Sequence, residues 1–182
     1  DGLVEEAVAS ARQQVELGRA RRDDQMVLAA FAGAAWTLVR TGHEAEAGAL
    51  LDEFLERRRE NPAGVTPGYW MVYAALALAR LGRRGALASL NESSGPRFLA
   101  AAQAVDAGRF AEAAELLREI GVPQLEAEVL VLEARELAAG GDQPGAEARL
   151  ARARALLEGL GATARLRELD EAWPVPSRSG GT

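Results

Sequence analysis

The feature of the sequence that most constrains its fold is a pattern repeated around four glycines, Gly42, Gly82, Gly108 and Gly141. An alanine stands seven residues before each of them, at Ala35, Ala75, Ala101 and Ala134. An apolar residue stands five residues after all four glycines, and again nine and twelve residues after three of them. Such spacing forms one stripe on a helix. The pattern predicts helical hairpins in which each glycine ends the first helix, because a residue without Cβ reaches the left-handed conformation cheaply.

A single hairpin of this kind cannot bury both of its faces, so neighbouring hairpins must stack. The small alanines allow the helices to approach closely, and β-branched residues nowhere alternate over the length of a strand. We therefore expect an all-α fold, a right-handed α-α superhelix of stacked antiparallel helical hairpins. The second unit departs from the pattern, because Asn91 and Ser94 replace apolar residues and Gly95-Pro96 follows. We expect a short second helix there, over 84–91, and a weak point in the stack.

The glycines are 40, 26 and 33 residues apart, and the spacing resembles the tetratricopeptide repeat, whose period is about 34 residues. Phe110, two residues after Gly108, matches an aromatic that this family often has there. The resemblance covers roughly residues 24–160. Residues 108–161 are in addition similar to the C-terminal repeats of bacterial signalling proteins with a STAND-type ATPase, in the context of class III nucleotidyl cyclases or LuxR-type regulators. That resemblance implies a sensor or assembly arm that gates another module.

The predicted organisation is one helical repeat domain, 1–173, and a Pro/Ser/Gly-rich tail, 174–182. The units are expected at roughly 25–60, 67–91, 96–120 and 123–160. A partial helix at 3–20 precedes them and a capping helix at 162–173 follows them. The helix at 3–20 has the character of the second helix of a preceding unit, so we expect the chain to be a fragment of a longer protein. The tail is expected to dock on a surface or to form a crystal contact.

Charge and composition narrow the classes of function. The net charge is −6, all 21 basic residues are arginine, and cysteine is absent. Acidic character argues against nucleic-acid binding, and without cysteine there is no disulfide framework, thiolate nucleophile or cysteine metal site. No apolar run is long enough to span a bilayer and no signal peptide is visible. A cytoplasmic, bacterial protein is the expectation.

No group of residues indicates catalysis. His43, the single histidine, lies in a turn beside Glu44 and Glu46, which is typical of a solvated helix start. The carboxylate pairs Glu115/Glu119 and Glu133/Glu136 are expected on exposed helical faces. We therefore expect no enzyme, no cofactor and no metal site.

The candidate partner site is the inner face formed by the first helices of the units. By analogy with the family, residues two, six and about thirteen positions before the glycine look into this groove, and Tyr69, Trp70 and Tyr73 form an aromatic cluster beside it. Trp36 and Tyr69 are expected to expose ring surface, because aromatic and arginine residues are typical of binding hot spots. The candidate residues are Trp36, Arg40, Tyr69, Tyr73, Arg80, Glu128 and Arg135.

These residues lead to two hypotheses. The first is a non-catalytic protein–protein interaction and regulatory module. Its partner is a protein or peptide, or another domain of its own full-length chain. The alternative is a structural spacer or oligomerisation arm with no groove ligand, for which a homo-oligomer is the expected partner. The sequence leaves open whether the groove binds a peptide or a small molecule.

Overall fold

The computed structural model describes residues 2–21, 23–61, 66–88 and 97–173 of the chain. That part of the chain contains nine helices and no strand, which confirms the all-α prediction. The helices are α1 (Gly2–Arg19), α2 (Asp24–Arg40), α3 (Glu44–Glu60), α4 (Trp70–Arg80), α5 (Arg97–Asp106), α6 (Phe110–Ile120), α7 (Pro123–Ala139), α8 (Gln143–Gly159) and α9 (Thr163–Ala172). Among the described helices, none combines the length and the apolar character that crossing a bilayer requires.

Local sequence signals account for where the helices begin and end. The Asp23 side chain accepts a hydrogen bond from the backbone N–H of Gln25 at 2.9 Å, and so caps α2. Pro123 occupies the first turn of α7, where its missing N–H costs nothing. The four glycines of the repeat all have positive φ, between 69° and 87°. The predicted turn positions are therefore confirmed.

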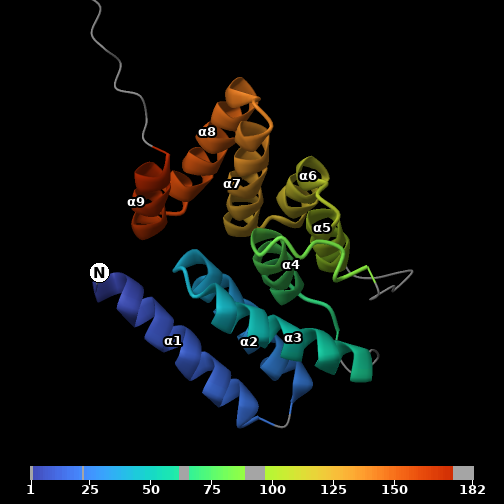
Figure 1. The fold of residues 1–182 in the computed structure, drawn as a ribbon. Helices are drawn as coiled ribbons and strands as arrows, with labels where there is room; N and C mark the ends of the chain where they lie inside the picture. Colours follow the sequence, from blue (N-terminus) through green and yellow to red (C-terminus); the bar gives the residue numbers. More distant parts are fainter. Residues whose placement is uncertain (1, 22, 62–65, 89–96, 174–182) are drawn as a thin grey trace, which may run out of the picture.

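The helices pack mainly against their neighbours in the chain (Figure 1). Each of α1, α2 and α3 packs on the next, and the run from α4 to α9 does the same. Two pairs of helices that are not neighbours in the chain also pack on each other, α2 on α4 and α4 on α7. Helix α4 thus lies at the centre and joins the N-terminal helices to the C-terminal ones.

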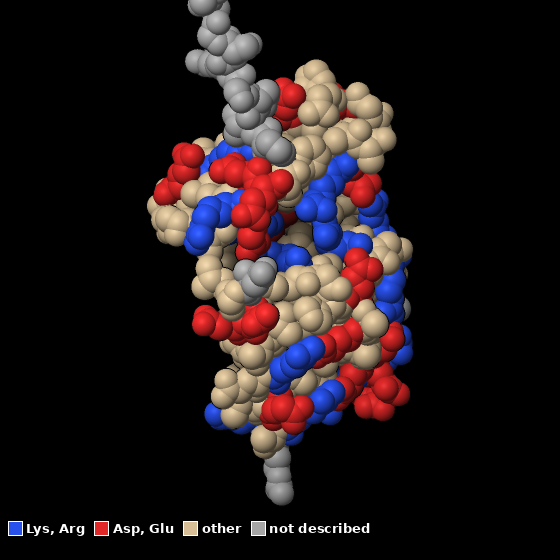
Figure 2. Space-filling model, turned by 60° about the vertical axis from the view of Figure 1, so that its left-hand side comes forward, with Lys and Arg blue, Asp and Glu red and all other residues tan. Residues whose placement is uncertain are grey.

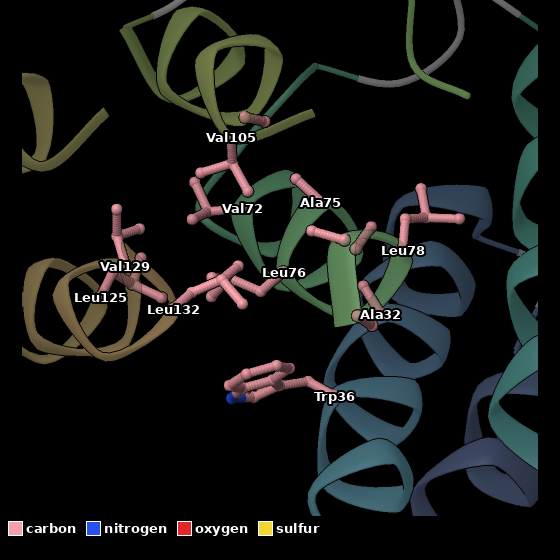
Figure 3. Packing of buried hydrophobic residues seen from close by; sticks show 14 of the residues in the cluster. Ala32, Trp36, Val72, Ala75, Leu76, Leu78, Val105, Leu125, Val129 and Leu132 are labelled. Atoms are coloured by element: carbon pink, nitrogen blue, oxygen red, sulfur yellow. The ribbon is translucent and has the colours of Figure 1, made fainter. Parts of the chain in front are cut away.

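The core is built from alanine and leucine. All four repeat alanines have no exposed surface, which confirms that they lie where helices approach closely. Trp36 of α2, Leu76 of α4 and Leu132 of α7 converge in Figure 3. This convergence fixes α2, α4 and α7 relative to one another, and it sets the shape of the surface that these three helices share.

The second unit is more irregular than predicted. Residues 84–88 form consecutive turns instead of the start of a helix over 84–91, and residues 89–91 and the break at 93–96 lie outside the described residues. In this segment the backbone N–H of Leu87 donates a hydrogen bond of 3.0 Å to the buried carboxylate of Asp106. Burial raises the pKa of Asp106, and the backbone N–H groups around it offset part of that rise. The tail predicted to dock, 174–182, also lies outside the described residues.

Helices α1 and α3 are linked by two ion pairs that we call the α1–α3 seam. Arg12 Nη2 lies 2.9 Å from Glu46 Oε2, and Arg19 Nη2 lies 2.8 Å from Glu53 Oε2. In each pair the two residues are 34 positions apart in the sequence. Two pairs with the same separation mean that α1 lies beside α3 in a constant register.

Candidate functional site

The candidate site is a pocket of about 580 Å³ that we call the inner pocket. It is lined by residues of α1, α2, α4, α7 and α9, together with Thr41. Figure 2 shows this hollow with arginine side chains inside it and around its margin. Helices from both ends of the described chain contribute, since α1 and α9 line the pocket together with α2, α4 and α7.

The inner pocket brings together five of the seven candidate residues from the sequence. These five are Trp36, Arg40, Arg80, Glu128 and Arg135. The other two, Tyr69 and Tyr73, do not line the pocket. Their rings meet edge to face with centroids 6.2 Å apart, and Tyr69 is 55% exposed. The two tyrosines share the face of α4 that carries Arg80, because they precede it by eleven and seven residues.

Tyr73 lies close to the charges of the pocket. Burial raises its pKa, and the negative charge of Glu128 raises it further, while Arg40 acts in the opposite direction. We call the tyrosine pair and the inner pocket together the inner face, although neither tyrosine lines the pocket.

The expectation that Trp36 exposes ring surface is wrong. Trp36 is only 6% exposed, because its indole packs toward Leu76 and Leu132 (Figure 3). The Arg40 guanidinium carbon lies 6.0 Å from the ring centroid and covers another part of it. Trp36 contributes a wall to the pocket instead of a free ring.

Glu128 is the centre of the charge network. Its side chain is 4% exposed, and Arg165 of α9 donates two hydrogen bonds to it, from Nε at 2.8 Å and from Nη2 at 2.7 Å. Arg40 Nη1 lies 3.7 Å from the same carboxylate. Burial lowers the pKa of Arg165, but the hydrogen bonds and charge of Glu128, helped by Glu168, outweigh it, and the net change is upward. The bidentate geometry is the strong form of such a pair.

Helix α9 is held over the pocket largely by polar contacts. Arg40 of α2 donates to Glu168 of α9, and Arg154 of α8 donates to Asp170 at 2.9 Å and to the carbonyl of Trp173 at 2.7 Å. Leu169 is the one residue of α9 that is fully buried. The sequence predicted a helix here, but no local signal shows that its Arg165 and Glu168 belong to the site.

Two arginines of the pocket are left without partners. Among the described residues, neither Arg80 nor Arg135 makes a hydrogen bond or an ion pair. The Nε of Arg135 is buried and has no acceptor. Burial lowers the pKa of Arg80, and the nearby positive charges of Arg165 and Arg40 add to that effect, whereas Glu44 and Glu128 oppose it. Four arginines and three glutamates thus line the pocket, and two of the arginines, Arg80 and Arg135, make no ion pair with a described residue.

Other carboxylates of α7 serve the packing. Glu126 pairs with Arg152 of α8, and Glu133 Oε2 lies 2.8 Å from Arg149 Nε. Glu133 is only 8% exposed, so the expectation of an exposed Glu133/Glu136 pair is wrong for Glu133. The cause is the close contact of α7 with α8, which covers this face of the helix.

The described residues offer little to a metal ion. They contain no group of three or more histidine, cysteine, aspartate or glutamate residues placed to bind one. The ring Nδ1 of His43 lies 3.1 Å from the carbonyl oxygen of Thr41, so the ring is held in its own turn. The inner pocket places guanidinium groups beside an apolar wall.

Comparison with protein-family models, with curated proteins and with solved structures gave no match.

Proposed function

We propose that this chain is a non-catalytic binding and regulatory module built from tetratricopeptide-like repeats. The observation that carries the proposal is the inner face, where Arg80 and Arg135 line the pocket without ion pairs and Tyr69, the residue before α4, exposes its ring. Arginine and tyrosine are enriched among residues that dominate binding energy. A surface that leaves two cations unpaired costs folding free energy, and binding a partner is a reason to retain it.

The repeat architecture supports the same proposal. The two ion pairs of the α1–α3 seam repeat at 34 residues, which is the period of tetratricopeptide repeats. In a right-handed superhelix of such hairpins, α1 takes the place of a second helix and α9 that of the capping helix. The proposed place of the module is a cytoplasmic sensor or assembly arm of a larger bacterial signalling or transcription-regulatory protein, and its partner is a protein, a peptide or another domain of that protein.

One observation favours the alternative, a structural spacer or oligomerisation arm. Helix α9 already uses Arg40 and Glu128 for ion pairs across the groove. A groove occupied by the chain itself is what a purely structural arm requires. The alternative predicts that no partner depends on the residues of the inner face.

The partner proposal is tested by capture from an extract of the native host with purified chain on a support, followed by mass spectrometry. Tyr69→Ala removes an exposed ring and is expected to abolish retention of the partner without loss of helicity. Leu17→Ala is the matched control, because Leu17 is 57% exposed on α1.

A partner retained by wild type and by Leu17→Ala, but lost from Tyr69→Ala, supports the proposal. Equal retention by all three chains, or loss only from Leu17→Ala, contradicts it. A wild-type chain that retains no protein leaves the structural arm as the better account.

A further inference from the structure

The charges of the inner pocket are unevenly matched. Of the four arginines that line it, Arg40 and Arg165 are engaged by the carboxylates of Glu128 and Glu168. Arg80 and Arg135 have no partner among the described residues. A guanidinium group stays protonated in proteins and offers five N–H donors with no acceptor. Among the described residues these donors have no acceptor, so water or an acceptor that enters the pocket can satisfy them.

The positions of these two arginines show that they are not ordinary solvated surface groups. Each is half-buried, and the Nε of Arg135 is shielded from solvent. A desolvated charge without a partner costs free energy. Arg80 ends α4 and Arg135 lies in α7, and these two helices pack on each other. Both side chains line the same hollow, which places both within reach of a ligand that fills it.

The size and outline of the pocket favour a compact ligand. Its volume of about 580 Å³ lies in the range of small-molecule sites, roughly 300–1,000 Å³. Helix α9 lies over one side of the hollow and the start of α1 over the other (Figures 1 and 2). A hollow of this volume, lined by helices on two sides, can enclose a small molecule.

The remaining walls are apolar. Val131 and Leu132 of α7, Leu169 of α9 and an edge of Trp36 line the pocket beside the arginines. Small-molecule sites typically combine such apolar walls with a few convergent polar groups. The walls can cover the apolar body of a ligand whose acidic group faces Arg80 and Arg135.

We propose that the inner pocket binds a compact organic anion, whose carboxylate or phosphate group is held by Arg80 and Arg135 and whose apolar part packs against Leu132, Leu169 and Trp36. The inference rests on the proposed function, since it names the ligand class of the same inner face. It makes the module a sensor of a small acidic molecule, with α9 as the element closest to that molecule.

The test is isothermal titration calorimetry of the purified chain with three probes of one size, namely benzoate, phenyl phosphate and benzyl alcohol. The alcohol has the same ring without the charge. We expect saturable binding of at least one anion and none of the alcohol, and the tighter of the two anions identifies the acidic group. Arg80→Met and Arg135→Met should each weaken that binding about tenfold or more, because each removes charge-assisted hydrogen bonds.

Arg118→Met is the matched control, since Arg118 is exposed and paired with Glu115 on α6, and it should bind like wild type. Circular dichroism of each variant shows whether it is folded. Binding that survives in a folded Arg80→Met/Arg135→Met chain, or the failure of both anions to bind wild type, overturns the proposal. Neither result depends on Tyr69 or on a captured protein, so the failure of this inference is distinct from failure of the partner proposal.

Discussion

The α1–α3 seam and the inner pocket use the same side chains, arginine and glutamate, to opposite effect. In the seam, Arg12 and Arg19 each face a carboxylate one repeat away, and both arginines are substantially exposed. In the pocket, the carboxylate of Glu128 is buried and shared by two arginines, while Arg80 and Arg135 have none. The seam is balanced and solvated, and the pocket is unbalanced and partly desolvated.

The difference shows that an arginine of this protein can serve one of two purposes. The arginines of the seam pair with carboxylates, whereas Arg80 and Arg135 are left without such a pair in the pocket. Exposed ion pairs contribute little free energy, because the two charges are already well solvated. Removing one partner from a buried pair costs much more, because it leaves a charge in a medium of low dielectric constant. An unpaired, half-buried arginine therefore indicates a residue that packing alone does not require.

The largest expected effect is at the centre of the pocket. Glu128→Ala leaves Arg165 and Arg40 without their shared carboxylate, and we expect it to lower the free energy of unfolding by about 3 kcal/mol. Urea denaturation followed by circular dichroism measures the change. Glu46→Ala, which removes an exposed partner in the seam, is the control and should unfold like wild type. If Glu128→Ala and Glu46→Ala lower the free energy of unfolding equally, the pocket and the seam do not differ in the way proposed.

A smaller effect of opposite sign is expected for the unpaired arginines. Arg80→Met and Arg135→Met each replace a partly desolvated cation by an apolar side chain of similar length, so we expect each to raise the free energy of unfolding by about 1 kcal/mol. Arg165→Met is the control, because it removes the two hydrogen bonds that Arg165 donates to the buried Glu128 carboxylate and should destabilise the fold. Thermal unfolding of the three variants checks the order. Destabilisation by Arg80→Met would mean that Arg80 serves the packing after all.

The smallest effect is expected in the seam and depends on pH. Burial raises the pKa of Glu53, but the hydrogen bonds and charges of Arg19 and Arg57 outweigh it, and the net pKa is lowered. Since the folded pKa lies below the unfolded value of about 4.3, the pair stabilises the fold above that pH, and its contribution is lost as the pH falls through the lowered value. Glu53→Gln should cost less than about 1 kcal/mol at neutral pH.

The measurement for Glu53→Gln is urea denaturation of variant and wild type at neutral and at acidic pH. The difference between the two chains should disappear in acid and shrink in high salt, because salt screens exposed charges. A difference that grows in acid would show that the sign of the pKa shift is wrong.

The helices and the buried face of each hairpin were predictable because their signals are local. A capping aspartate, a proline at a first helical turn or a glycine with positive φ acts within a few residues of its own position, as at Asp23, Pro123 and Gly42. The burial of the repeat alanines follows from their spacing along one helix. Five candidate residues line one pocket because α2 packs on α4 and α4 packs on α7, which no local signal predicts.

What the sequence by itself determined is thus the all-helical class, the glycine turns and the burial of the repeat alanines. Tertiary structure alone decided which charges are paired. Arg40 reaches Glu168 across 128 positions of sequence, and Glu128 takes its second arginine from α9. The energy of an ion pair depends on the separation of two charges and on the dielectric around them. Both quantities arise only when distant helices meet, so no local pattern distinguishes the paired arginines from Arg80 and Arg135.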